Sequence, residues 1–436
     1  MIIHPARRLS GRLRMPGDKS ISHRAAMFAA IAEGQSVITG FASSADCHST
    51  LECLRTLGIN IVIDGTTVTI DGRGLYGFRA PSADLDCGNS GSTMRMLSGL
   101  LAGCAFDSTL TGDDSLRSRP MGRIIAPLEK MGAAISSEGG KAPLRITGRK
   151  PLNPISYETP VASAQVKSCV LLAGLFADGR TEVIEKLGLT RDHTERMLRW
   201  FGAEVESHRS ESGAPVVAVH GGSKLSARNL AVPGDISSAA FFIAAAALLP
   251  GSDLLIENVG LNPTRAQVVE AVRALGVDIR IEEQWEDGNE LIGNLRIKGG
   301  AALSATTAPA VLEGPVIAQL IDELPVLSVL GTQVQGGLLI RNAAELRVKE
   351  SDRIATTVAN LRAMGAEVEE FSDGLQVHGP VQLHGTRLQA HGDHRIAMAF
   401  SIAGLIADGE TEIVGAECAA VSFPEFFEIL ASVRVD

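Results

Sequence analysis

Basic side chains recur in this chain where helices are expected to begin, a placement that suits the binding of anions. In the segment 15–24, Lys19 and Ser20 stand directly before a helical run, and Arg24 lies about one turn inside it. Ser20 is a suitable N-cap, so its hydroxyl, the backbone amides, the helix dipole and two cations would together form an anion site. For this segment alone, an ordinary capped helix with solvated basic residues is an equal alternative.

The same arrangement recurs along the first half of the chain. Gly91 and its small neighbours open a helix at 88–95, where a ligand could approach the backbone closely. Pro120 is expected at the first position of the next helix, with arginines on both sides. Polar side chains begin two further helices, at 160–167 and 190–195. A solvated surface remains open for any single arginine, but the set favours a site for a polyanionic small molecule.

Acids and bases stand side by side before two helices of the second half. Lys349 and Glu350 precede one helix, with Ser351 as a candidate cap, and Asp393 and His394 precede the other. Adjacent acid and base groups can transfer protons as well as bind anions. We therefore expect proton transfer to depend on this half of the chain.

A six-copy internal repeat supplies the elements that position these residues. In each copy a helical stretch ends at a glycine-containing break, and a strand-like run follows at once. The six breaks contain Gly34, Gly103, Gly179, Gly251, Gly331 and Gly409. A second helix lies between copies, usually with its own glycine stop. Each unit is therefore expected to hold two helices and several strands, and the chain is predicted to be an α/β protein.

Six units divide naturally into two lobes of three. Pro-Gly pairs interrupt the pattern at 16–17 and 233–234, and such pairs favour chain reversals between elements. If the chain crosses between lobes at both places, residues 1–17 together with 232–436 form a C-terminal lobe. Residues 18–231 then form an N-terminal lobe.

Composition excludes several classes of partner. The net charge is -10 and only 4% of residues are aromatic, which argues against a nucleic-acid surface. The six cysteines lack metal-ligand spacing, so core thiols are favoured over metal or disulfide roles. The first residues carry no long apolar run, and the longest apolar stretch, 239–249, is too short to span a bilayer. We expect a cytoplasmic protein with no membrane partner.

The motifs, taken in order, resemble those of the 5-enolpyruvylshikimate-3-phosphate (EPSP) synthase family over nearly the whole chain. The matching segments are 16–20 with Arg24, 89–92, 119–120, 163–165, 322–323, 347–353, 393–395 and 422–424. The resemblance implies two lobes, each a pseudo-threefold assembly of βαβαββ units that forms an inside-out α/β barrel. It also implies transfer of the enolpyruvyl group of phosphoenolpyruvate to the 5-hydroxyl of shikimate 3-phosphate, with release of phosphate. This shikimate-pathway step leads to chorismate and aromatic amino acids, proceeds through a tetrahedral intermediate, and needs no metal or organic cofactor.

The resemblance also implies a role for particular residues. Those for shikimate 3-phosphate are Lys19, Ser20, Arg24, Ser163, Ala164, Gln165, Arg191, Asp322 and Lys349. Those for phosphoenolpyruvate are Lys19, Asn89, Gly91, Arg119, Gln165, Arg353 and Arg395. Arginine suits this ligand because its fork donates two parallel hydrogen bonds to a carboxylate or phosphate. Asp322 is implied as the base for the 5-hydroxyl and Glu350 as the proton carrier at the methylene carbon, while Lys19 acts between the two substrates.

Several of these assignments have alternatives in the residues themselves. Asp322 could be a helix cap, and Glu323 beside it is as plausible a base without the family match. His394, with Asp393, could shuttle a proton or orient its neighbours, and we favour orientation. Arg191 could be satisfied by the acids that follow it.

The chain departs from the family pattern in ways that bear on inhibition. Val421 stands where some members carry a lysine, so one phosphoenolpyruvate contact is absent or replaced. The patterns at 162–165 and 190–195 are similar to a subclass that includes glyphosate-tolerant enzymes, whereas Gly91 is usually linked to sensitivity. Glyphosate is the expected inhibitor, but the sequence leaves open how strongly it inhibits. We expect the chain to act as a monomer.

Two rival functions remain. UDP-N-acetylglucosamine enolpyruvyl transferases share the fold, but they usually carry a cysteine before the Arg-Pro pair, and the segment 112–118 has none. A non-catalytic anion-binding protein would keep the arginines and could lose the proton-transfer pair, whereas both Asp322 and Glu350 are present.

Because the implied residues come from both halves, we expect the lobes to close on binding.

Overall fold

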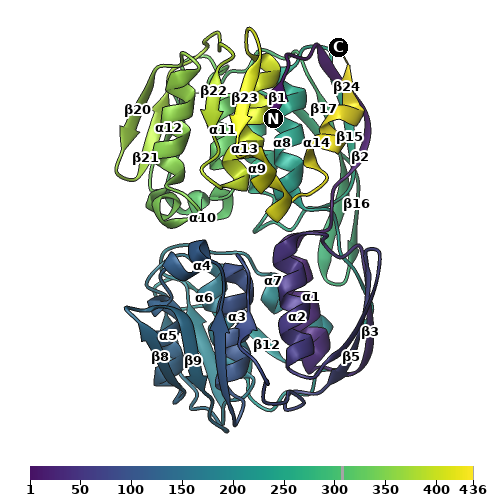
Figure 1. Ribbon diagram of the computed structural model, residues 1–436, viewed down its shortest axis with the longest axis vertical. Helices are drawn as coiled ribbons and strands as arrows, with labels where there is room; N and C mark the ends of the chain where they lie inside the picture. The colour runs from purple at the N-terminus through teal and green to yellow at the C-terminus, as the bar shows by residue number, and fades with distance from the viewer. Residues whose placement is uncertain (306–308, 436) are drawn as a thin grey trace. The chain divides into compact units, whose positions relative to one another are not determined.

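The computed structural model describes residues 1–305 and 309–435 of the chain. These residues fold into two compact units. The C-terminal unit contains Met1–Pro16, Pro233–Trp285 and Leu291–Asp436, and the N-terminal unit contains Gly17–Val232 and Glu286–Glu290. Each unit has its own hydrophobic core. Figure 1 shows the helices and strands of both units, which are described separately below.

The N-terminal unit contains three four-stranded sheets of one design. Their orders are β14-β3-β5-β4, β6-β7-β9-β8 and β10-β11-β13-β12. In each sheet the first two strands are parallel and the other pairings are antiparallel. The strands are β3 (Glu33–Thr39), β4 (Asn60–Asp64), β5 (Thr67–Arg73), β6 (Leu85–Asp86), β7 (Asp107–Thr111), β8 (Ala134–Glu138), β9 (Lys141–Thr147), β10 (Ser156–Glu158), β11 (Arg180–Ile184), β12 (Val205–Arg209), β13 (Pro215–His220) and β14 (Leu230–Ala231).

Helices cover these sheets and fill the centre of the unit. They are α1 (Lys19–Ile31), α2 (Ala45–Thr56), α3 (Gly91–Ala102), α4 (Asp114–Ser118), α5 (Gly122–Lys130), α6 (Ala164–Gly174) and α7 (His193–Trp200). Helices α1, α3 and α6 are buried almost all round, as expected for helices whose small and apolar residues are spread over most of their faces. A side chain at Gly99 would place its Cβ 2.3 Å from the carbonyl oxygen of Cys169, so glycine permits the close approach of α3 to α6.

The C-terminal unit also contains three sheets, of four, three and five strands. Its sheets have the orders β18-β19-β21-β20, β1-β23-β22 and β16-β17-β15-β2-β24. The strands are β1 (Ile2–Ile3), β2 (Arg8–Arg14), β15 (Asp253–Gly260), β16 (Asp278–Asp287), β17 (Glu290–Lys298), β18 (Ala310–Leu312), β19 (Leu338–Ile340), β20 (Val368–Phe371), β21 (Gly374–Val377), β22 (Arg387–Gln389), β23 (Thr411–Val414) and β24 (Arg434–Val435). The N-terminal strands β1 and β2 pair with β23 and β15, which explains why residues 1–16 belong to this unit.

The helices of the C-terminal unit follow the same plan. They are α8 (Ile236–Leu248), α9 (Gln267–Ala274), η1 (Gly314–Val316), α10 (Ile317–Leu320), α11 (Leu324–Gly331), η2 (Ala344–Val348), α12 (Arg353–Ala363), α13 (His394–Ile406), η3 (Ala416–Val421) and α14 (Phe426–Val433). The apolar stretch at 239–249 lies largely in α8, which is buried in the core as predicted. Helix α12 lies along the β20–β21 hairpin (Figure 1).

Apolar helices are short in the described part of the chain. No single helix there is both long and apolar enough to cross a membrane. The bent pair Gly314–Leu320 and Leu324–Gly331 passes such a test by combined length and composition alone. Every residue of α11 is buried in the core of its unit.

Candidate active site

The start of α1 places two of the predicted cations. Asp18 is the N-cap of this helix, because its Oδ1 accepts a hydrogen bond from the backbone N–H of Ile21 at 2.8 Å. The prediction that Ser20 caps the helix is therefore wrong; Ser20 is its second residue. Lys19 extends to Asp46 in the first turn of α2, with 2.7 Å between Nζ and Oδ2. Asp46, which the sequence did not single out, holds Lys19 in place.

Arg24 lies one turn further along α1, and its guanidinium is buried among neutral oxygens. Its Nε donates to Thr194 Oγ1 at 2.7 Å, Nη1 to the carbonyl oxygen of Ser20 at 2.9 Å, and Nη2 to Ser168 Oγ at 2.9 Å. Burial lowers the pKa of Arg24 to about 10, and the nearby cation Arg191 acts in the same direction. A group in this state favours the arrival of an anion, since a negative charge would offset its desolvation.

A buried series of hydrogen bonds joins the start of α1, the middle of α2 and the start of α3. His23 Nδ1 lies 2.7 Å from Thr50 Oγ1, which lies 2.7 Å from Thr93 Oγ1, and Thr93 donates to Ser90 Oγ at 2.7 Å. Burial lowers the pKa of His23 to about 3, so the imidazole is neutral at physiological pH. Ser90 caps α3 through the backbone N–H of Thr93, and Gly91 is the first residue of that helix. This series of hydrogen bonds thus fixes the backbone at Gly91 relative to α1 and α2.

Asn89 and Arg119 lie together at this helix start. Arg119 Nη2 donates to Asn89 Oδ1 at 2.7 Å, and Nη1 donates to the carbonyl oxygen of Asn89 at 3.3 Å. The predicted helical position of Pro120 is wrong, because α5 begins at Gly122 and Arg119 is the C-cap of α4. Proline at 120 instead follows an extended residue, as the geometry before proline favours.

Helix α6 brings Gln165 to the same group of side chains. A helix begins within 160–167 as predicted; Ser163 is its N-cap and accepts from the backbone N–H of Val166 at 3.4 Å, and Ala164 is the first helical residue. Gln165 Oε1 accepts from Arg95 Nη1 at 2.6 Å, and Gln165 Nε2 donates to Ser92 Oγ at 2.8 Å. Arg95 stands one turn inside α3, as Arg24 stands inside α1, and that similarity could have identified it from the sequence.

Side chains of α6 and α7 and of Glu185, just after β11, form a buried charged group that the sequence did not reveal. Lys167 Nζ lies 3.0 Å from Glu185 Oε2 and 2.7 Å from Glu195 Oε1. Burial lowers the pKa of Lys167, but the two carboxylates outweigh it and the net direction is upward. Burial raises the pKa of Glu195, and the opposing effect of Lys167 does not cancel it. Arg191 is half-buried immediately before α7, whose N-cap is Asp192.

In the C-terminal unit, Arg353 collects three carboxylates at the start of α12. Its Nε lies 2.8 Å from Asp393 Oδ2, Nη2 lies 2.6 Å from Glu350 Oε2, and Nη1 lies 3.4 Å from Asp322 Oδ1. Burial lowers the pKa of Arg353, but the three acids outweigh it, so the guanidinium stays charged. Asp352, not the predicted Ser351, caps the helix by accepting from Ala355 N–H at 3.0 Å. Ser351 instead donates to Asp393 Oδ2 at 3.0 Å.

Asp393 links this group to the start of α13. It is the N-cap of that helix and accepts from Arg395 N–H at 2.9 Å. Burial alone would raise its pKa, but Arg353 holds the pKa of Asp393 below its ordinary value. His394 is buried as the first residue of α13. Burial also lowers the pKa of Lys349, and Arg353 contributes in the same direction.

The two neighbouring acids Asp322 and Glu323 have different surroundings. Glu323 is fully buried and accepts from Arg265 Nη1 at 2.9 Å and from Ser237 Oγ. The Asp322 carboxylate retains 17% exposure, while its backbone oxygen accepts from Arg395 Nη1 at 3.1 Å. Neither acid makes a side-chain cap to α11, whose N-cap is Glu323. Of the two, Asp322 is the carboxylate that a substrate could reach.

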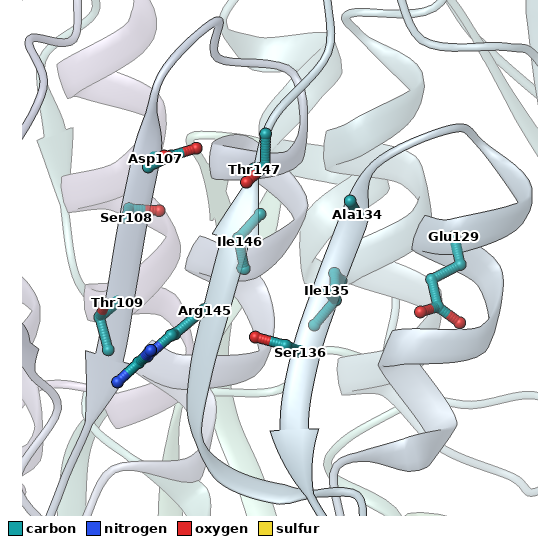
Figure 2. A pocket seen from close by; sticks show the side chains of 10 residues that line it. All are labelled: Asp107, Ser108, Thr109, Glu129, Ala134, Ile135, Ser136, Arg145, Ile146 and Thr147. Atoms are coloured by element: carbon teal, nitrogen blue, oxygen red, sulfur yellow. The ribbon is translucent and has the colours of Figure 1, made fainter.

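One hollow in the N-terminal unit lies apart from all of these residues. It has a volume of about 450 Å³ and is lined by residues of β7, β8 and β9 with Glu129 of α5, as Figure 2 shows. None of its ten lining residues is a predicted site residue. Among the described residues, no group of three or more His, Cys, Asp or Glu side chains is placed to hold a metal ion.

Fold and site together define an α/β protein of two repeat-built units, with arginine-rich polar clusters at helix starts. The chain belongs to the EPSP synthase (3-phosphoshikimate 1-carboxyvinyltransferase) family, whose sequence model matches residues 3–430. The 3-phosphoshikimate 1-carboxyvinyltransferase of Koribacter versatilis (strain Ellin345) is 51% identical over 432 residues, covering 99% of this chain and 98% of the relative. That of Desulfitobacterium hafniense (strain Y51) is 49% identical over 433 residues, covering 99% of this chain and 97% of the relative.

Solved structures agree with this family. The EPSP synthase from Acinetobacter baumannii superimposes with a TM-score of 0.86 at 43% identity, covering 99% of this chain and 97% of that one. The enolpyruvyl transferase NikO from Streptomyces tendae, at 19% identity, covers 99% of this chain and 96% of that one with a TM-score of 0.77 and shares the fold. The predicted α/β fold and family are therefore confirmed.

Proposed function

We propose that the protein transfers the enolpyruvyl group of phosphoenolpyruvate to the 5-hydroxyl of shikimate 3-phosphate and releases phosphate. The observation that carries this proposal is the cluster at α12, where one buried arginine holds both Asp322 and Glu350. An anion-binding protein needs the arginine, but it has no need of two carboxylates that compete with its ligand. Two acids at a cationic site suit a reaction in which one group must lose a proton while another gains one.

For shikimate 3-phosphate we propose the polar residues at the starts of α1, α6 and α7. They are Lys19, Ser20, Arg24, Ser163, Ala164, Gln165 and Arg191, with Asp322 and Lys349 at the reacting end. The desolvated guanidinium of Arg24 supports this assignment, because its hydrogen bonds go to neutral oxygens and not directly to a carboxylate. Asp322 would then accept the proton of the attacking hydroxyl.

For phosphoenolpyruvate we propose Lys19, Asn89, Gly91, Arg119, Gln165, Arg353 and Arg395. The fork of Arg119 is already oriented by Asn89, and that of Arg353 by Asp393. Oriented guanidinium groups lose little freedom when they bind a carboxylate or phosphate. Glu350 would protonate the methylene carbon during addition and recover the proton during elimination, with His394 and Asp393 supporting the group.

The direct test is a phosphate-release assay with phosphoenolpyruvate and either acceptor. We expect turnover with shikimate 3-phosphate and none with UDP-N-acetylglucosamine. Preference for the nucleotide sugar would replace the proposal by the rival transferase. Binding of both substrates without phosphate release would favour a non-catalytic protein.

Arg119→Ala should mainly weaken phosphoenolpyruvate binding. Hydrogen bonds to charged groups contribute about 1.5–3 kcal/mol, so we expect KM for phosphoenolpyruvate to rise about ten- to a hundredfold, with a much smaller change for shikimate 3-phosphate. Steady-state kinetics with each substrate varied in turn measure both constants. Arg117→Ala is the matched control, because Arg117 is exposed and pairs only with Asp114 among the contacts described. An unchanged KM for phosphoenolpyruvate in Arg119→Ala would remove this residue from the proposed site.

We further propose glyphosate as an inhibitor, a monomeric state and a cytoplasmic location. At Gly91 an added Cβ would lie 2.7 Å from Arg95 Nη1, so alanine there would displace the arginine that bonds Gln165. Glycine thus leaves room next to the proposed phosphoenolpyruvate residues, which supports competition by a compact anionic inhibitor. Inhibition of phosphate release by glyphosate and light scattering of the eluted protein test the first two statements.

A further inference from the structure

The tip of the β16–β17 hairpin carries a buried carboxylate. Residues 286–290 of this hairpin belong to the N-terminal unit. The turn residues Gly288 and Asn289 both have positive φ, 57° and 63°, which is the backbone of a tight two-residue hairpin turn. Glu290 directly follows the turn and is only 2% exposed. A buried carboxylate is costly unless it is paired, so Glu290 requires a hydrogen-bond or ionic partner.

That partner is the first residue of α7. Glu290 Oε1 lies 2.7 Å from His193 Nδ1, and His193 is itself buried. The turn also exchanges two hydrogen bonds with Arg196: Arg196 Nη1 donates to the carbonyl oxygen of Asn289 at 2.9 Å, and Asn289 Nδ2 donates to that of Arg196 at 3.2 Å. The hairpin tip therefore holds the first turn of α7 at both of its ends.

The same helical turn contacts Arg24 and directly follows the segment of Arg191, two of the residues proposed to bind shikimate 3-phosphate. Thr194 Oγ1 accepts from Arg24 Nε at 2.7 Å and lies 2.6 Å from Ser168 Oγ, which accepts from Arg24 Nη2. Arg191 stands two residues before His193 in the chain. A displacement of this turn would therefore move one of the oxygens that orient Arg24 and, with it, the backbone that carries Arg191.

We propose that Glu290 is a positioning residue for shikimate 3-phosphate: through His193 it fixes the first turn of α7, and that turn aims Arg24 and Arg191 at the substrate. This inference rests on the proposed function. Its chemical basis is a hydrogen bond remote from the substrate, which keeps two cations in the arrangement that an anion requires. Preorganisation of this kind lowers the cost of binding without adding a contact.

Kinetics of Glu290→Ala test the inference. Loss of the hydrogen bond should raise KM for shikimate 3-phosphate about tenfold, with KM for phosphoenolpyruvate and kcat within about twofold of wild type. Glu290→Gln should restore most of the affinity, because its carbonyl oxygen can accept from the imidazole N–H in the same place. Glu286→Ala is the matched control, since Glu286 is an exposed acid in the same hairpin tip. Thermal unfolding of each variant is measured alongside.

A role in folding alone predicts a different result. If Glu290→Ala lowers the unfolding temperature but leaves KM for shikimate 3-phosphate unchanged, the carboxylate only fastens the hairpin and the inference is wrong. An equal rise of both KM values would also contradict it. Should Glu290→Ala fail to fold, Glu290→Asp retracts the carboxylate by one methylene while keeping its charge, and it should show the same selective rise.

The inference and the proposed function can fail separately. An active wild type with an unaffected Glu290→Ala variant overturns only the inference. An inactive wild type overturns the proposed function, and the inference is then decided by calorimetric titration of wild type and Glu290→Ala with shikimate 3-phosphate. Equal affinities, or no binding by the wild type, would reject it.

Discussion

Glu350→Gln is expected to lower kcat by about two to four orders of magnitude, the range typical for loss of a general acid or base. Glutamine keeps the length of the side chain, and its carbonyl oxygen can still accept from Arg353 Nη2, which lies 2.6 Å from Glu350 Oε2. The substitution therefore preserves the arrangement at the start of α12 but removes the group that can carry a proton. KM for both substrates should change far less than kcat, because Glu350 is proposed to act in the transition state.

Isotope exchange separates this role from a structural one. Protonation of the methylene carbon creates a methyl group, and elimination then removes one of its three hydrogens. Wild-type turnover in deuterated water should therefore place deuterium in the methylene group of the product. Glu350→Gln should slow deuterium incorporation and phosphate release together. Glu367→Gln provides the control, since Glu367 is an exposed acid shortly after α12. Turnover like that of wild type in Glu350→Gln would reject the assignment.

The sequence predicts the elements of this site better than their first residues. Ser163 and Asp393 lie where helices are expected to begin, and each is the N-cap of its helix. At Ser20 and Ser351 an aspartate nearby takes the role. Two cap-forming residues within three positions satisfy the same local rule, so tertiary packing decides between them.

The buried partners were beyond reach for a different reason. Lys167 meets acids that lie 18 and 28 positions later, and Glu290 meets a histidine 97 positions earlier. Neither spacing has a periodicity that marks a contact, and each residue alone is ordinary on a solvated surface. The repeat predicts that helices form, but not which of their polar side chains face inward. The family resemblance identified residues that are expected to touch substrate. Asp46, Thr194 and Glu290 contact those residues or their neighbours, and only the structure shows these contacts.

Lys167→Met should cost about 3–5 kcal/mol of unfolding free energy, as expected when one partner of a buried ion pair is removed. Methionine fills a similar volume, so the loss should come from charge and not from a cavity. Glu185 and Glu195 would remain buried without their shared cation, both being at most 3% exposed. Chemical denaturation at pH 8 measures the difference. Lys186→Met is the control, because the Lys186–Glu158 pair is half exposed and should contribute only about 0–1 kcal/mol.

The pH dependence of the unfolding free energy identifies the cause of this loss of stability. In wild type the pKa of Lys167 is raised, so its stabilising contribution is fully present below the unfolded value of about 10.4 and is constant near neutrality. In Lys167→Met the folded pKa of Glu195, already raised by burial, should rise further. The folded state would then bind more protons than the unfolded state, so its stability should increase as the pH falls from about 8 toward 5. The difference in unfolding free energy between Lys167→Met and wild type should therefore narrow over that range. Adding Glu195→Gln to Lys167→Met should recover part of the lost stability at pH 8. A gap that does not change with pH would assign the loss to packing instead of to uncompensated carboxylates.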